Sequence, residues 1–467
     1  MMLIFDRIYL NTNLPEPKTY NEVCPVLLSD QTMEERYHKI IAGMKERELD
    51  YLVIYADKEH SGNFEYLTGF IPRFEEALLI LKQDHKIYYL LGNENLKMSQ
   101  YTRLPGHVIH VPSFSLPNQP MESEIALDSI FERQGLNQAN RIGFVGWKLF
   151  TGIEAKEGPF DIPHYIVEAL KRSARPDANL VNANDLFIGP GKGVRITNNA
   201  NEIAHYEYGA NLSSNCILNA LNAIEVDKAE IEIGKYLTAD GQVNTVVPIA
   251  ATGERFQQAN LYPTAKKIQR GDAFSLTTGF KGGLSSRTGL VVSNETEIPQ
   301  DQKDYLGRVV YPYYNAVVTW LENLRINKTG KEIYQLIETV LPKEQYGWSL
   351  NPGHLTADEE WMSSPIYPGS ENRIQSGMIF QIDIIPSVPG YTGVSAEDCI
   401  AIADEALRVR IQEEYPGLWK RILERREYIT QTLNISLSDE ILPLSNTVGY
   451  LRPFLLNKSA AMCCNKS

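Results

Sequence analysis

The stretch GDAFSLTTGF at residues 271–280, followed by GGLSSRTGLVV at residues 282–292, decides the fold of the second half of this chain. Two runs rich in β-forming residues on either side of a glycine turn predict a β-hairpin. The hairpin is informative because of what it lacks. Between Asp272 and Glu295 there is no carboxylate, and both strands carry hydroxyl side chains instead.

A second hairpin is predicted further along the chain, between residues 378–385 and 396–403 across a turn rich in proline and glycine. Asp383 lies in the middle of its apolar first strand, where an unpaired charge is costly. Asp383 is therefore either a hydrogen-bonded core acid or part of a site. Glu397 opens the facing strand, and pairing would place it opposite Asp383 unless it is an exposed turn residue. Two carboxylates that lie opposite each other on paired strands either share a cation or raise the pKa of one of the two groups.

The order of the other predicted elements favours an α/β (α+β) chain with two domains and a tail. Strands and helices alternate over the first part, which predicts an α/β domain at residues 1–184. A long helix at residues 201–224 opens the second domain, which we place at residues 185–435. We expect residues 436–467 to form a disordered C-terminal tail.

The composition is that of an ordinary globular protein of 467 residues, with 43% hydrophobic and 22% charged residues. The net charge of −13 argues against nucleic acid as a partner. No apolar run reaches the roughly 20 residues that span a bilayer, so no membrane partner is expected. The start of the chain does not read as a signal peptide, and five scattered cysteines form no disulfide framework. We therefore expect a cytoplasmic protein.

Several segments, in this order and spacing, resemble the creatinase, aminopeptidase P and prolidase family. Residues 33–70 are similar to its N-terminal domain. Glu202-Ile203, residues 271–279, Gly353-His354 and residues 376–398 are similar to its "pita-bread" catalytic domain. The resemblance covers nearly the whole chain and implies a creatinase-like α/β domain followed by a pita-bread domain.

In active peptidases of this family, two Asp, one His and two Glu hold two divalent metals. The resemblance implies that His354 takes the place of the His, Asp383 that of the first Glu and Glu397 that of the second Glu. The two Asp positions fall on Thr277 and on Ser286 or Thr288. Two hydroxyls do not compensate the charge of two cations, so we expect no dinuclear metal centre.

Three functions remain open from the sequence. The first is a hydrolase that cleaves a C–N bond of a small substrate without metal, as creatinase does on this fold. His354 would then be the general acid/base, with Asp383 and Glu397 beside it. The resemblance places the residues that bind the substrate at Asn260, Thr277 and Ser286.

The second function is a peptidase with one metal, at most one Mn, Zn or Co, held by His354, Asp383 and Glu397. The third is an inactive pita-bread protein that binds a small molecule or peptide. Family members are often dimers in which the neighbour closes the pocket. By that analogy we expect a homodimer in which Arg73 contacts substrate, although a surface ion pair is the simpler role for Arg73.

Overall fold

The computed structural model describes residues 7–119, 121, 124–156, 158–257 and 262–465. The chain divides into two compact units, which are Leu28–Ile196 on the one hand and Met1–Leu27 with Thr197–Ser467 on the other. This division groups the first 27 residues with the second half of the chain, whereas the sequence pattern placed them in the first domain. It also puts the junction at Ile196, beyond the expected position at residue 184.

The unit of residues 28–196 is built on a six-stranded mixed sheet with the strand order β5-β4-β3-β2-β6-β7. Strands β2, β6 and β7 are parallel, and β3 is antiparallel to both of its neighbours. Every residue of β2 is buried, as expected for a central strand covered on both faces. The strands are β2 (Tyr51–Ala56), β3 (Ala77–Lys82), β4 (Ile87–Leu91), β5 (His107–His110), β6 (Arg141–Val145) and β7 (Asn179–Asn182). The helices are α1 (Asp30–Glu46), α2 (Gly62–Thr68), α3 (Leu127–Arg133), α4 (His164–Ser173) and α5 (Asn184–Ile188).

The other unit holds two four-stranded antiparallel sheets, ordered β13-β10-β9-β8 and β11-β12-β14-β15, and a two-stranded sheet of β1 and β16. Its strands are β1 (Ile8–Asn11), β8 (Ile249–Thr252), β9 (Ala273–Phe280), β10 (Gly283–Leu290), β11 (His354–Leu355), β12 (Ile379–Gln381), β13 (Ser395–Glu397), β14 (Cys399–Ile402), β15 (Ile441–Pro443) and β16 (Ala461–Cys464). Its helices are α6 (Ala200–Ala223), α7 (Glu230–Gly234), α8 (Tyr311–Asn323), α9 (Gly330–Val340), α10 (Lys343–Tyr346), α11 (Glu405–Glu414) and α12 (Pro416–Glu427).

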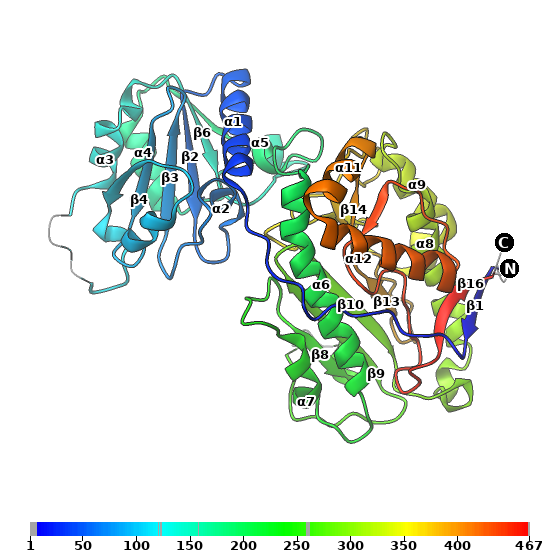
Figure 1. Ribbon diagram of the computed structural model, residues 1–467. Coiled ribbons are helices and arrows are strands. Elements are labelled where there is room, and N and C mark those ends of the chain that lie inside the picture. Colours follow the sequence, from blue (N-terminus) through cyan, green and yellow to red (C-terminus); the bar gives the residue numbers. More distant parts are fainter. Residues whose placement is uncertain (1–6, 120, 122–123, 157, 258–261, 466–467) are drawn as a thin grey trace. The chain divides into compact units, whose positions relative to one another are not determined.

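The long helix α6 fixes which face of the β9–β10 hairpin is left for a site. A reciprocal cap between Asn199 and Glu202 begins the helix, and α6 packs along β9 and β10 (Figure 1). Ser213 of α6 lies 3.3 Å from Ser285 of β10, so Ser285 points toward the helix. Because side chains alternate along a strand, Ser286 points to the opposite face.

The second predicted hairpin forms only in part. Strand β12 pairs with β14, as expected, but β13 pairs with β10 in the other sheet. The chain changes sheets at Asp398, between β13 and β14. Glu397 is therefore opposite Ser286, and the expected register with Asp383 is wrong.

The segment that we expected to be a disordered tail is ordered over residues 436–465. Strand β16 pairs with β1 near the start of the chain, and Cys463 and Cys464 are buried. The pairing partner lies more than 400 residues away in the sequence, so no local pattern predicts this strand. Within the described residues, no helix is both long enough and apolar enough to cross a bilayer.

Candidate functional site

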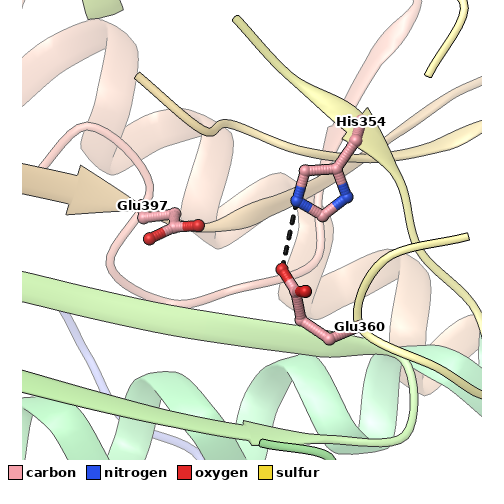
Figure 2. Close-up of side chains that lie close together, drawn as sticks. All are labelled: His354, Glu360 and Glu397. Carbon is pink, nitrogen blue, oxygen red and sulfur yellow. Dashed lines mark ion pairs between the residues drawn. The ribbon is translucent and has the colours of Figure 1, made fainter. Parts of the chain in front are cut away.

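Four titratable side chains from separate segments meet in the unit that contains both four-stranded sheets. His354 comes from β11, Asp383 follows β12, Glu397 ends β13 and Glu360 lies in the loop after β11. Figure 2 shows His354, Glu360 and Glu397 with their polar ends turned toward one another. One potential ligand atom from each of these three lies within 4.8 Å of the others. We call His354, Glu360, Asp383 and Glu397 the acidic site.

His354 presents its ring nitrogen Nε2 to this site. Its Nε2 lies 3.1 Å from Glu360 Oε1 and 3.9 Å from Asp383 Oδ2, yet it makes no well-aligned hydrogen bond with any described residue. Its Nδ1 lies 3.3 Å from the carbonyl oxygen of Leu355, and the ring packs 4.0 Å from that of Trp361. If Nδ1 donates to that carbonyl, Nε2 carries the lone pair that binds a metal or accepts a proton.

The carboxylates of the acidic site repel one another in a buried setting. Burial and the nearby Glu360 raise the pKa of Asp383 to about 6, although His354 lowers it. Burial, and then Asp383 and Glu360, raise the pKa of Glu397 well above its ordinary value. Burial lowers the pKa of His354, but the two acids beside it outweigh that effect and raise it. A cation between these groups would remove the repulsion that keeps their protons on.

The face of the β9–β10 hairpin beside Glu397 carries a row of hydrogen-bonded hydroxyls. Thr277 donates to Ser286 at 3.0 Å, and Ser286 lies 3.0 Å from Ser395. Ser395 donates in turn to Thr288 at 3.3 Å, and Thr288 to Ser275 at 3.0 Å. We call these five buried residues the hydroxyl row.

The residues of the acidic site could hold a divalent cation. At the acidic site, the buried Nε2 of His354 faces three carboxylates, which is a ligand set suited to a divalent metal. In the hydroxyl row, Thr277 and Ser286, which the resemblance aligns with the two Asp positions, bond to each other. Neutral oxygens that are already satisfied cannot balance a second divalent charge.

A buried ion pair holds Glu397 in place. Arg287 Nη2 lies 2.5 Å from Asp398 Oδ2, and Asp398 also accepts hydrogen bonds from Ser285 and Thr447. Arg287 in addition donates to the carbonyl oxygen of Glu397 at 3.1 Å. Because Asp398 is fully paired, it anchors the point where the strand changes sheets. It thereby fixes the backbone from which Glu397 reaches the acidic site.

The expected site residues are only partly brought together. His354, Asp383 and Glu397 converge, and Thr277 and Ser286 lie in the hydroxyl row. Asn260 lies outside the described residues. Arg73 is exposed in the other unit, where its guanidinium lies 5.1 Å from the ring centre of Phe74.

Sequence reasoning missed Glu360. The sequence interpretation assigned no role to the acids that follow His354, at residues 358–360. Its position in the sequence could have indicated a role, because Glu360 follows His354 by only six residues. The loop that carries Glu360 returns to the strand of His354. The main-chain bond from Leu355 to Ser363 closes that loop at 2.7 Å.

Comparison with known proteins supports this fold. Residues 204–404 match metallopeptidase family M24. A search of curated proteins finds no match. Among solved structures, an Xaa-Pro dipeptidase from Bacillus anthracis is similar at 16% identity and a TM-score of 0.61, over 80% of this chain and 96% of that one.

Two further solved structures have a similar fold. A prolidase from Pyrococcus horikoshii OT3 is similar at 19% identity and a TM-score of 0.61, over 79% of this chain and 95% of that one. An X-Pro aminopeptidase from Thermotoga maritima MSB8 is similar at 14% identity and a TM-score of 0.59, over 79% of this chain and 95% of that one. The expected resemblance and fold class are confirmed: residues 204–404 match metallopeptidase family M24, and the fold of the chain is similar to that of the solved prolidases.

Proposed function

We propose that this protein is a hydrolase that cleaves an amide C–N bond in a short peptide or small amide with the help of a single divalent cation. His354, Glu360 and Glu397 would hold the cation, with Asp383 beside them. One observation carries the proposal. The fully buried Nε2 of His354, which makes no well-aligned hydrogen bond with any described residue, lies among three carboxylates, two of which have raised pKa values.

A cation bound here would supply Lewis acidity to the substrate's carbonyl group. Side chains of the protein would transfer the proton, limit the access of water and bind the substrate. Asp383, whose pKa of about 6 lies near neutral pH, is placed to take a proton from water and return it to the leaving nitrogen. Trp361 covers one face of the His354 ring and so limits the access of water to it. The hydroxyls of Thr277 and Ser286 would bind neutral parts of the substrate.

A second candidate is the hydrolase without metal. The 3.1 Å ion pair between His354 and Glu360 favours it, because a carboxylate beside an imidazole stabilises the protonated ring. The imidazolium would then protonate the leaving nitrogen. Both candidates need His354, but only the first needs a cation.

The experiment is a hydrolysis assay on dipeptides, with Xaa-Pro substrates first because the similar solved structures bear those names. The protein is assayed with Mn²⁺, Co²⁺ or Zn²⁺ and again after treatment with a chelator. We expect hydrolysis that needs the cation and is lost in Glu360→Gln. Turnover that survives the chelator but is lost in His354→Ala would select the hydrolase without metal. No turnover on any substrate would favour a binding protein instead.

The oligomeric state is a separate proposal. We expect a homodimer in solution, by analogy with the family. Light scattering on purified protein tests this, and a mass of 52.8 kDa, that of one chain, would contradict it.

A further inference from the structure

Glu360 reaches His354 from a short loop, residues 356–362, which we call the acid loop. Figure 2 shows the carboxylate of Glu360 turned toward the His354 ring. The loop is closed at its base, where the main-chain N–H of Met362 donates to the carbonyl oxygen of Leu355 at 3.0 Å. A closed base does not by itself decide where the rest of a loop lies, so the placement of Glu360 needs a second point of attachment.

A buried ion pair attaches the acid loop to the turn between β9 and β10. Asp358 Oδ1 lies 3.6 Å from Lys281 Nζ, and the side chain of Asp358 is only 6% exposed. Asp358 Oδ2 accepts a hydrogen bond from the hydroxyl of Tyr206 in α6 at 3.2 Å. Next to this pair, the main-chain N–H of Gly282 donates to the carbonyl oxygen of Ala357 at 2.8 Å. Each oxygen of the Asp358 carboxylate is therefore bound by an element outside the loop.

The turn between β9 and β10 is a firm support, because it packs directly against the main chain of α6. A Cβ atom on Gly282 would lie 2.1 Å from the carbonyl oxygen of Tyr206, and a Cβ atom on Gly209 would lie 1.9 Å from the carbonyl oxygen of Lys281. Gly282 also has a φ of 103°, which glycine adopts without strain. The hairpin and α6 thus fix the places from which Lys281 and Tyr206 hold the acid loop.

Hydrogen bonds within the acid loop connect Asp358 to Glu360. The carbonyl oxygen of Glu359 accepts from the main-chain N–H of Ala357 at 3.1 Å and from the hydroxyl of Thr356 at 3.1 Å. This carbonyl shares a planar peptide group with the N–H of Glu360. The backbone is therefore held on both sides of Asp358, and the side chain of Glu360 starts from a fixed peptide group.

We propose that the ion pair between Lys281 and Asp358 positions Glu360 beside His354. Asp358 is then a positioning residue that acts through Glu360 and prepares the acidic site for its cation. The cation rests on the function proposed above, whereas the placement of the acid loop does not.

The proposed role of Lys281 can be told apart from a simple effect of charge. A lysine close to a cation site repels the cation, so charge alone would make removal of Lys281 strengthen cation binding. Loss of the ion pair has the opposite effect, because the acid loop is then no longer held where Glu360 reaches the site. The two effects therefore differ in sign.

The first measurement is calorimetric titration of the full-length protein with MnCl₂. We expect Asp358→Asn and Lys281→Met each to weaken binding by about tenfold, as is typical when a residue that orients a metal ligand is replaced. Lys331→Met, which removes a surface ion pair with Glu371, is the matched control and should bind like the unaltered protein. Because Lys281 is partly exposed, Lys281→Met keeps the test valid if Asp358→Asn fails to fold. Binding of Mn²⁺ by Lys281→Met that is as tight as in the unaltered protein, or tighter, would overturn the proposal.

The second measurement needs no cation. The ring of Trp361, in the acid loop, lies 4.0 Å from that of His354, so the tryptophan shifts the NMR signal of the His354 ring protons. Trp361→Leu gives the signal without this shift. At the same pH, we expect Asp358→Asn and Lys281→Met to move the His354 signal part of the way toward its position in Trp361→Leu. Lys331→Met should leave it in place.

The two measurements separate this inference from the proposed function. A His354 signal that stays in place in both Asp358→Asn and Lys281→Met would overturn the positioning of Glu360. A signal that moves, in a protein whose unaltered form binds no Mn²⁺, would support the positioning and contradict the proposed cation.

Discussion

The β9–β10 hairpin and the acidic site face the same space, and they differ in charge. The hairpin offers the hydroxyl row, in which every oxygen is neutral and bonded to a neighbour. The acidic site offers three carboxylates and an imidazole nitrogen. Both rest on regular antiparallel ladders and buried apolar residues. One pair of sheets therefore carries a neutral surface and an ionisable one side by side.

The largest effect is expected when the imidazole is removed. In His354→Ala we expect cation affinity and any turnover to fall by at least about 100-fold, because Nε2 is both the nitrogen ligand and the proton carrier. Calorimetric titration with MnCl₂ and the dipeptide assay measure the two losses. His164→Ala, an exposed histidine of the other unit, is the matched control. Undiminished turnover in His354→Ala would remove this residue from the site.

Acids introduced into the hydroxyl row would test whether its neutral side chains prevent a second cation from binding. In the double variant Thr277→Asp with Ser286→Asp, we expect two cations per chain at saturating Mn²⁺. Without cation, the unpaired buried carboxylates should destabilise the protein by several kcal/mol, on the order of the cost of a broken buried ion pair. Thermal unfolding with and without Mn²⁺ measures both effects. A double variant as stable without cation as the unaltered protein would show that the row is open to water.

The pKa of Asp383 makes a prediction about stability. The folded protein holds a proton on Asp383 up to about pH 6, whereas the unfolded chain releases it near 3.8. The free energy of unfolding should therefore fall as the pH rises between those values. Asp383→Asn removes this penalty and should stabilise the cation-free protein at pH 7 by about 2–3 kcal/mol.

The measurement is chemical denaturation of both proteins at pH 4 and pH 7. The gain should be present at pH 7 and small at pH 4, where Asp383 is protonated in the folded state. The same variant should lose turnover, since an amide cannot carry the proton. A gain that is equal at both pH values would contradict the shifted pKa.

The smallest effect is expected inside the hydroxyl row. Thr288→Val removes a hydroxyl that bridges Ser275 and Ser395 but preserves shape. We expect a loss of about 1 kcal/mol in the free energy of unfolding and no change in cation affinity. A change in cation affinity would mean that the row and the acidic site are coupled.

Much of the fold and part of the site could be predicted from the sequence. The β9–β10 hairpin and α6 follow from local periodicity and turn residues, and His354 and Asp383 from the family resemblance. The register of Glu397 could not be predicted, because the chain changes sheets at Asp398 and that depends on the distant Arg287. Strand β16 was missed for the same reason, since its partner β1 lies at the other end of the chain.

The proposed hydrolase needs one cation per chain at the acidic site. The direct measurement is elemental analysis of protein equilibrated with Mn²⁺ and freed of excess ion, for the unaltered chain and for Glu360→Gln, with Glu371→Gln, at an exposed glutamate, as the control. We predict one Mn²⁺ per chain in the unaltered protein and in the control, and none in Glu360→Gln. Two ions per chain in the unaltered protein, or one ion retained without the Glu360 carboxylate, would contradict the account.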